Sequence, residues 1–325
     1  MDFKLPLGDA VENMVEFLLG HAQWLFDAID LAIGGLVGGI GIMLSWLPGV
    51  VLAGIVVLLA LWRVGWKFAA FACVALAGIF ALDLWPQTVD TLGLVLAATI
   101  VALVVGVPVG IAAGRSDRTD AALRPVLDFM QTMPAFVYLI PAAMFFGLGR
   151  VPGTIATVIF ALPPTVRLTS LGIRQVPREL VEAGLAFGCT SRQLLLKVQI
   201  PTALPSIMAG VNQTIMLALS MVVIASMIGA GGLGNEVLRG IQRLDIGLGF
   251  ESGLAVVLVA ILLDRITQSF GKPRPAARRA RKPASAASPE QSRSKDRAAA
   301  PQPLEQGAGR ACPPRLVTSN QGEAR

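Results

Sequence analysis

The sequence has few charged residues and few of the side chains that metal sites and hydrolytic active sites need. Only 15% of its 325 residues are charged, and histidine occurs once, at His21. Soluble domains carry about 25% charged residues, so this composition argues for a membrane protein. A single histidine argues against a histidine-based catalytic site. The three cysteines, Cys73, Cys189 and Cys312, form no C-x-x-C pair, which argues against a metal knuckle or a disulfide framework.

Other signatures are also missing. The chain has no G-x-x-x-x-G-K-[ST] motif, so we do not expect it to bind ATP through a P-loop. The net charge is +6, but much of the positive excess lies near the C-terminus, so no nucleic-acid partner is expected. Residues 1–20 lack a basic segment followed by an apolar core, so no signal peptide is expected. A membrane enzyme would need clustered catalytic side chains, and an ion-coupled carrier would need acids at membrane depth. Asp264 is the one plausible intramembrane acid, and it lies beside Arg265.

Long apolar runs are what the sequence does contain. Hydrophobic residues make up 54% of the chain, and its length allows about six or seven membrane spans of about 20 residues. We expect an all-α, polytopic membrane protein with seven spans, in which Pro134 and Pro141 bend the fourth. The predicted spans cover residues 49–62, 67–85, 89–113, 129–148, 151–171, 203–228 and 253–270. Residues 229–250 form an outer segment with a short amphipathic helix at 236–243.

The charges between the spans predict the orientation of the chain. Arg63 and Lys67 lie between the first two spans, which places that turn in the cytoplasm. Alternation from there leaves the C-terminus inside. With seven spans, the N-terminus is then expected on the outer side of the cell's inner membrane.

The two ends differ from the apolar, membrane-spanning centre at residues 48–271. Residues 1–47 are expected to form an amphipathic or interfacial segment, with a complete span at 31–47 as the alternative. Residues 272–325 are rich in Pro, Ala, Ser and Arg, and predict a disordered, basic cytoplasmic tail. The start of this tail, at 272–282, is basic enough to contact anionic lipid.

The one long polar passage inside the apolar centre covers residues 175–205, QVPRELVEAGLAFGCTSRQLLLKVQIPTALP. Pro177 suits the first turn of a helix, and Gly188 suits a left-handed helix stop. Thr190 and Gln193 have the spacing of a capping box that opens a second helix. Its basic residues place the passage in the cytoplasm. We therefore predict a helix–turn–helix between two spans, which we call the elbow (residues 175–205).

The spacing within the elbow resembles the EAA loop of ATP-binding-cassette importer permeases, E-A-A-x-x-x-G, nine residues, then I-x-L-P. Here Glu182-Ala183-Gly184 is followed by Gly188 after three residues. Val198-x-Ile200-Pro201 follows after nine more. Gly184 replaces the second alanine, and Val198 and Ile200 replace isoleucine and leucine. The resemblance implies the transmembrane domain of a type I ABC importer.

In that family, this loop is a coupling helix docked on the ATPase. The resemblance carries this role onto the matching positions, which are Glu182, Ala183, Gly184, Gly188, Val198, Ile200 and Pro201. The alternative is that Ala183 and Gly184 only pack against the protein's own helices. The resemblance also implies two ATPase subunits, a second permease copy in a homodimer and a separate outer binding protein. It implies no cofactor bound directly and no catalysis by this chain, because ATP is used by the partner subunit.

The sequence after the elbow resembles the glycine betaine/proline betaine and choline branch of these permeases, most densely at residues 176–248. The expected function is therefore ATP-driven import of quaternary ammonium compounds, with selectivity mainly in the binding protein. Another importer branch, for an amino acid or a sulfonate, is the first alternative, and an ion-coupled carrier is the second.

Two groups of side chains are candidates to line the translocation path. Tyr138, Phe145 and Phe146 in the fourth span could contact a passing cation, although ordinary helix packing also explains them. Asn212, Gln213 and Ser220 are polar residues of the sixth span. For these, hydrogen bonding between helices is the alternative to a path role.

Overall fold

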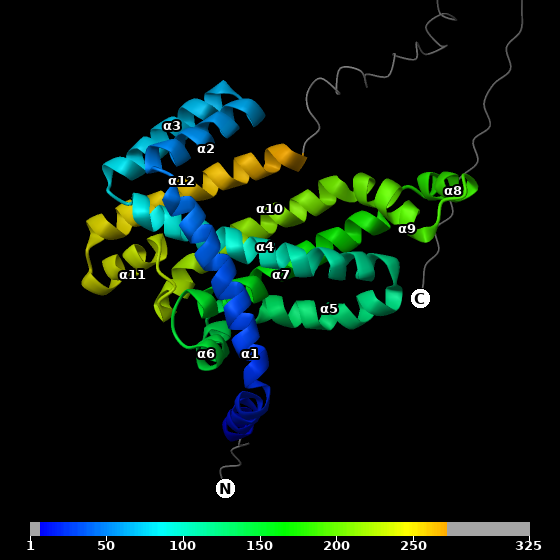
Figure 1. Cartoon of the computed structure of the whole chain (residues 1–325), viewed down its shortest axis with the longest axis horizontal. Helices are drawn as coiled ribbons and strands as arrows, with labels where there is room; N and C mark the ends of the chain where they lie inside the picture. The colour runs from blue at the N-terminus through cyan, green and yellow to red at the C-terminus, as the bar shows by residue number, and fades with distance from the viewer. Residues whose placement is uncertain (1–6, 272–325) are drawn as a thin grey trace, which may run out of the picture. The chain divides into compact units, whose positions relative to one another are not determined.

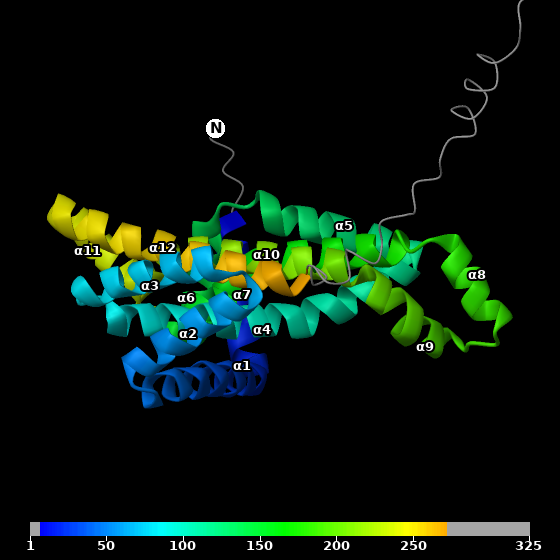
Figure 2. The same ribbon diagram turned by 90° about the horizontal axis from the view of Figure 1, so that it is seen from above.

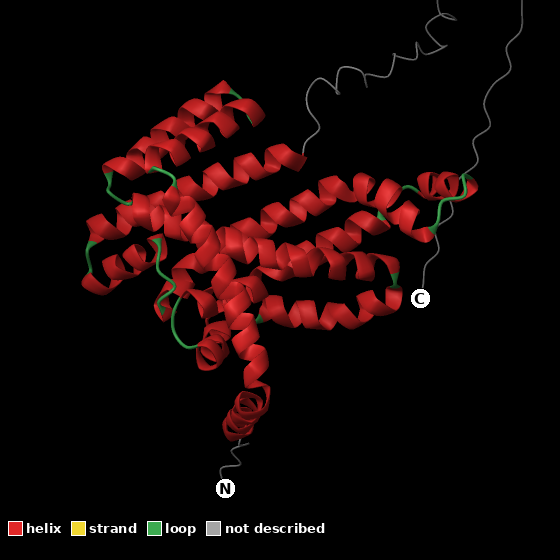
Figure 3. Cartoon of the chain, in the orientation of Figure 1, coloured by secondary structure: helices red, strands yellow, loops and turns green. Residues whose placement is uncertain are grey.

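All regular structure in residues 7–271, the part of the chain that the computed structural model describes, is helical (Figures 1 and 3). The predicted all-α class is confirmed. The predicted tail at 272–325 lies outside the described residues. The helices are α1 (Leu7–Trp46), α2 (Gly49–Arg63), α3 (Trp66–Ala81), α4 (Trp85–Arg115), α5 (Asp117–Thr132), α6 (Ala135–Phe146), α7 (Arg150–Arg174), α8 (Arg178–Ala186), α9 (Ser191–Leu194), α10 (Ile200–Ala225), α11 (Leu233–Arg243) and α12 (Ile246–Gly271). A π-helical turn (Leu195–Gln199) joins α9 to α10, and a 3₁₀ turn (Ser226–Ile228) follows α10.

Helix α7 lies at the centre of the bundle and packs on α4 (Figure 1). Gly106, Gly110 and Gly114 form one stripe of α4, and each meets α7 without room for a side chain. A Cβ at Gly110 would lie 2.7 Å from the Cβ of Thr169. Small residues let membrane helices approach closely, so that van der Waals contact and backbone proximity stabilise the pair. The glycine stripe therefore sets the α4–α7 distance.

On its other side, α7 is joined to α10 by a buried hydroxyl pair. The Oγ1 atoms of Thr165 and Thr214 lie 2.6 Å apart, and the Thr214 hydroxyl also donates to the carbonyl of Ala161 at 2.9 Å. A Cβ at Gly210 of α10 would lie 3.3 Å from Cα of Thr165. Buried polar groups in a membrane bundle need such partners, because neither lipid nor water satisfies them there.

Five helices within residues 7–271 are long and apolar enough to cross a membrane: residues 20–46, 85–115, 150–174, 191–228 and 246–270. A sixth is present if the bent pair α5–α6 counts as one span. These helices support a multi-pass membrane protein, but they do not confirm seven spans. Helices α2 and α3 have only 15 and 16 residues, fewer than the roughly 20 that a bilayer needs. The chain turns between them at Gly65, whose φ is +128°.

The predicted fourth span at 129–148 is not one continuous helix. Helices α5 and α6 meet at a bend of 98° around Met133 and Pro134. Met133 is extended, as the residue before a proline prefers to be. Pro141 lies inside α6. The first of the two expected prolines thus separates two helices.

The N-terminal range α1 consists of two helices that meet at a kink at Ala22, whose φ and ψ are not helical. Its portion from Gly20 to Trp46 is long and apolar enough to span a membrane. This range overlaps the span at 31–47 that is the alternative to an interfacial segment, and the assignment of residues 1–47 stays a prediction. In Figures 1 and 2, α1 lies across the outside of the central helices.

The two ends of the bundle carry different elements. Helices α8 and α9 extend beyond one end, whereas α11 and the turn into α12 lie at the opposite end (Figures 1 and 2). The short amphipathic helix expected at 236–243 corresponds to α11. Helix α8 thus lies at the end where α7 stops, and α9 begins the long apolar helix of residues 191–228.

Candidate functional site: the elbow between α7 and α10

Three residues connect α7 to α8. Val176 in the middle of this connection is 7% exposed, and Pro177 is the N-cap residue of α8. Glu179 lies in the first turn of α8, where the positive end of the helix dipole favours a carboxylate. Helix α8 therefore starts directly after the buried residue Val176, close to the end of α7.

The turn after α8 has the geometry that the sequence predicts. Gly188 has a φ of +77°, and its N–H donates to the carbonyl of Leu185 at 2.9 Å. The N–H of Cys189 donates to the carbonyl of Gly184 at 3.1 Å. These bonds satisfy carbonyls that the end of a helix leaves without partners. The left-handed stop at Gly188 is confirmed.

The capping box is also confirmed. The backbone N–H of Thr190 donates to Oε1 of Gln193 at 2.9 Å, and the N–H of Gln193 donates to Oγ1 of Thr190 at 3.4 Å. A reciprocal cap of this kind fixes the start of α9 relative to the turn. With Gly188, it sets the angle between α8 and α9.

Gly184 faces the inside of the elbow. It is buried, and a Cβ there would lie 2.7 Å from Cδ1 of Leu194 and 3.8 Å from Cγ2 of Val198. The absent side chain thus allows α8 to pack on α9. For Gly184, this contact corresponds to the alternative in which the residue packs against its own chain.

The outer surface of α8 carries exposed apolar side chains. Phe187 is 89% exposed, Leu185 55% and Leu180 45%, and Glu182 and Ala183 are exposed beside them. A group of exposed apolar side chains outside the apolar spans is typical of a surface that a partner covers. Phe187 is absent from the predicted coupling residues. Its position beside the turn glycine of the motif is a signal that could have found it.

The last three motif residues lead into α10. Val198 and Ile200 are half-buried, and Ile200 packs on a cluster that includes Ile173 and Ala203. Pro201 is exposed and lies in the first turn of α10, where proline leaves no hydrogen bond unmade. These residues connect the elbow to the bundle.

The aromatic path candidates lie on α6 and pack within the protein. Tyr138 is buried, and its hydroxyl donates to the carbonyl of Met130 at 2.6 Å. Phe145 stacks on Phe26 of α1 with ring centroids 4.6 Å apart, and Phe146 meets the same ring edge-on at 5.7 Å. These contacts agree with the helix-packing interpretation.

The polar path candidates on α10 have three different surroundings. Nδ2 of Asn212 donates to Oδ1 of Asp264 on α12 at 2.8 Å. Gln213 is exposed, and Ser220 is an exposed residue whose hydroxyl donates to the carbonyl of Met216 at 3.0 Å. Asn212 therefore joins two helices, and Asp264 is part of that connection. Within the described residues, no group of three or more His, Cys, Asp or Glu side chains could hold a metal ion.

The sequence from residue 106 to residue 272 matches the family described as binding-protein-dependent transport system inner membrane component. The chain belongs to this family. It is 49% identical to the glycine betaine/proline betaine transport system permease protein ProW of Escherichia coli, over 82% of this chain and 76% of that protein. It is 48% identical to the glycine betaine transport system permease protein OpuAB of Bacillus subtilis, over 82% and 95% of the two chains. It is 50% identical to the glycine betaine/carnitine transport permease protein GbuB of Listeria monocytogenes, over 82% and 96%.

The permease also shares its fold with a solved transporter. An inward-facing structure of the MetNI methionine ABC transporter matches with a TM-score of 0.51 at 21% identity, covering 57% of this chain and 94% of that one. The type I importer fold is confirmed. The chain is a multi-pass permease subunit of the inner membrane and not an enzyme. Its family implies separate ATPase subunits that use ATP and a substrate-binding partner.

Proposed function

We propose that this chain is the permease of an ATP-driven importer of quaternary ammonium compounds, namely glycine betaine, proline betaine or choline. The observation that carries the proposal is an identity of about half over 82% of the chain to three permeases named for glycine betaine. Selectivity lies mainly in the partner binding protein. This view fits the aromatic side chains of α6, which are engaged in packing.

Uptake assays test the substrate. The permease, reconstituted in proteoliposomes with its own ATPase and binding protein, should take up radiolabelled glycine betaine, proline betaine or choline only when ATP is present inside. Methionine and taurine serve as comparison substrates from other importer branches. ATP-dependent uptake of either in place of the quaternary amines would contradict the proposal. Uptake driven by an ion gradient without ATP would also contradict it.

We further propose that the elbow transmits force from the ATPase. Glu182, Ala183 and Phe187 lie on its outer surface and would contact the ATPase, whereas Gly184 and Gly188 shape the helix pair behind them. Val198, Ile200 and Pro201 would pass the movement into α10. Phe187 is the aromatic anchor in this arrangement, because large apolar side chains that fill a partner's pocket dominate binding energies.

Cross-linking tests this contact. Glu182→Cys and Phe187→Cys should form cross-links to cysteines placed in the ATPase groove. Leu244→Cys, at the opposite end of the bundle and 87% exposed, is the matched control and should form none. If the elbow variants fail to cross-link while the complex remains assembled, the elbow does not dock on the ATPase.

The complete assembly that we propose has two copies of this chain, two ATPase subunits and one outer binding protein. The chain presents its N-terminus outside and its C-terminus in the cytoplasm, with membrane lipid around the spans and no nucleic acid. Native mass spectrometry of the purified complex would measure this stoichiometry directly.

A further inference from the structure

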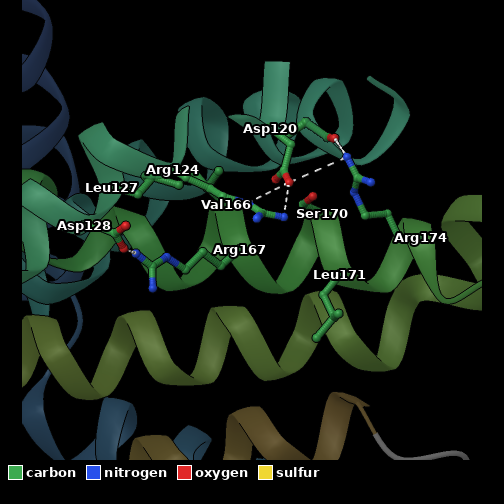
Figure 4. Close-up of a pocket in the computed structure, with 10 residues that line it drawn as sticks. Asp120, Arg124, Leu127, Asp128, Val166, Arg167, Ser170, Leu171 and Arg174 are labelled. Atoms are coloured by element: carbon green, nitrogen blue, oxygen red, sulfur yellow. Dashed lines mark hydrogen bonds and ion pairs between the residues drawn. The ribbon is translucent and has the colours of Figure 1, made fainter. Parts of the chain in front are cut away.

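A cavity of about 340 Å³ lies between α5 and α7, with Ala113 of α4 at its edge. Its position is at the elbow end of α7, where Arg174 is the last helical residue. Apolar side chains, including Leu127 and Val166, form part of its wall. The polar part of the wall consists of Ser170 and five charged residues, which are Arg124, Arg167, Arg174, Asp120 and Asp128. Figure 4 shows these side chains pointing into the space from both helices.

Both signs of charge face the cavity in neighbouring pairs. Arg174 contacts Asp117 at 2.6 Å and Asp120 at 3.7 Å, and its second nitrogen donates to the carbonyl of Ala113 at 2.8 Å. Arg124 pairs with Asp120 at 2.6 Å along α5. The guanidinium of Arg167 pairs with Asp128 across the two helices (Figure 4). The cavity therefore offers cationic and anionic groups within one small volume.

This pattern selects a small molecule that is itself a zwitterion. A simple anion would be attracted by the arginines but repelled by the aspartates beside them. A simple cation would be attracted by the aspartates but repelled by the arginines. A zwitterion can place its carboxylate on an arginine and its ammonium group near an aspartate. Its methyl groups would then contact Leu127 and Val166. A volume of 340 Å³ is that of several water molecules and leaves room for such a ligand.

The same geometry predicts weak binding. The cavity wall has no aromatic side chain, so it lacks the cation–π cage that holds trimethylammonium groups tightly. The ligand must also compete with ion pairs that already exist. Arg167 and Asp128 are 43% and 64% exposed, and such pairs are individually weak, so a ligand can replace them. Weak binding at the elbow end suits a place from which substrate leaves.

We propose that the α5–α7 cavity is a low-affinity site for a zwitterionic betaine on its way out of the permease. The proposal rests on the proposed function, and it adds a ligand site in a part of the chain away from the elbow surface. A zwitterionic lipid headgroup has the same chemistry, so the test must separate the two sources.

Saturation-transfer NMR can measure such weak binding. The permease–ATPase complex, without binding protein or ATP, is placed in nanodiscs of phosphatidylglycerol and titrated with glycine betaine. We expect saturable binding that Arg167→Gln weakens about tenfold, as for the loss of one charged hydrogen bond. Ser170→Leu fills the cavity without changing its charge, since Ser170 is 5% exposed in its wall, and it should also weaken binding. Arg150→Gln breaks the 2.9 Å ion pair to Asp90 elsewhere in the bundle and should leave binding unchanged.

Competitors and lipid complete the experiment. Choline and acetate, which each carry one of the two charges, should bind at least about tenfold more weakly than glycine betaine. Equal binding of choline or acetate, or unchanged binding in folded Arg167→Gln and Ser170→Leu variants, would overturn the proposal. Displacement of glycine betaine by phosphatidylethanolamine in the nanodisc would assign the cavity to lipid and also overturn it. The uptake assay tests the proposed function separately: if that function is wrong, the complete wild-type system will show no ATP-driven betaine uptake.

Discussion

Gly188 ends α8 in a left-handed conformation, and open space surrounds the position that a Cβ would occupy. A side chain at this residue is therefore limited by backbone strain and not by crowding. The left-handed region costs an L-residue roughly 1–2 kcal/mol, although asparagine tolerates it better than most. The angle between α8 and α9 thus depends on one backbone conformation.

This conformation can be tested with two variants at the same position. Gly188→Val should strongly reduce transport while the protein remains in the membrane, because a φ of +77° is a costly conformation for a β-branched residue. Gly188→Asn should retain most of the wild-type uptake. The measurement is ATP-dependent uptake normalised to the amount of permease in the membrane. Wild-type uptake by Gly188→Val would show that the turn does not set the working angle.

Local signals explain which residues of the elbow the sequence could predict. The stop at Gly188 and the cap at Thr190 depend on residues within a few positions of one another, so the pattern alone identifies them. The inward position of Gly184 depends on how α8 packs on Leu194, and the exposure of Phe187 follows from the same packing. Sequence periodicity places Gly184 and Phe187 on one apolar face of a helix, but it does not show which side chains the next helix covers.

At the scale of elements, the bundle is held by close approach of helices and by a few buried polar contacts. The G-x-x-x-G-x-x-x-G spacing of Gly106, Gly110 and Gly114 signals a close helix contact, but only the structure identifies α7 as the partner. The pair Asn212 and Asp264 is separated by 52 residues, so its contact is not visible in the sequence. The predicted range 49–62 nearly matches α2, whereas α3 ends at Ala81, four residues before the predicted end at 85.

A larger residue in the glycine stripe should separate α4 from α7. In Gly110→Leu, the new side chain would overlap Thr169 and the carbonyl of Val166, each 2.7 Å from the Cβ position. We expect a loss of about 1–3 kcal/mol in stability, as for overpacking elsewhere. Thermal unfolding of the purified permease measures it. Gly54→Leu is the control, since Gly54 is exposed on α2 with no atom within 4 Å of its Cβ position. An unchanged melting temperature for Gly110→Leu would contradict close packing of α4 on α7 at the glycine stripe.

The hydrogen bond between Asn212 of α10 and Asp264 of α12 should make a modest contribution to the free energy of unfolding. Asp264 also accepts two 2.8 Å hydrogen bonds from Gln268, so it keeps a partner when Asn212 is lost. A double-mutant cycle with Asn212→Leu and Asp264→Leu should give a coupling of about 0.6 kcal/mol, and less than about 1.7 kcal/mol. Unfolding in denaturing detergent provides the free energies. Gln213→Leu, at the exposed neighbouring position, should show no coupling to Asp264→Leu. A zero value for the Asn212 cycle would rule out a stabilising contact.

At the scale of the whole molecule, the elbow and the α11–α12 turn lie at opposite ends of the bundle (Figure 2). The elbow end carries more basic residues than the apolar spans, and basic residues favour the cytoplasm. If the elbow is cytoplasmic, the α11–α12 turn faces the outside, where a binding protein approaches.

Two cysteine positions can report this orientation. In a permease carrying Cys73→Ser and Cys312→Ser, the remaining Cys189 of the elbow is half-buried and available to a small reagent. A membrane-impermeant maleimide should label it in inside-out vesicles but not in intact spheroplasts. Leu244→Cys in a chain that also carries Cys189→Ser should show the reverse pattern. Labelling of Cys189 in intact spheroplasts would place the elbow outside and refute the coupling role.

The short junction between α7 and α8 limits how the molecule can move. Only Gln175, Val176 and Pro177 separate the two helices, and Val176 is buried. Because this connection is so short, a displacement of α8 also moves the end of α7. The 25 residues of α7 form a rod roughly 37 Å long, since each residue adds about 1.5 Å. A tilt of about 5° started at the elbow would therefore shift the far end of this rod by ~3 Å. The far end of α7, at Arg150, would move together with the elbow, so a small tilt at the elbow end would displace the opposite end of this helix.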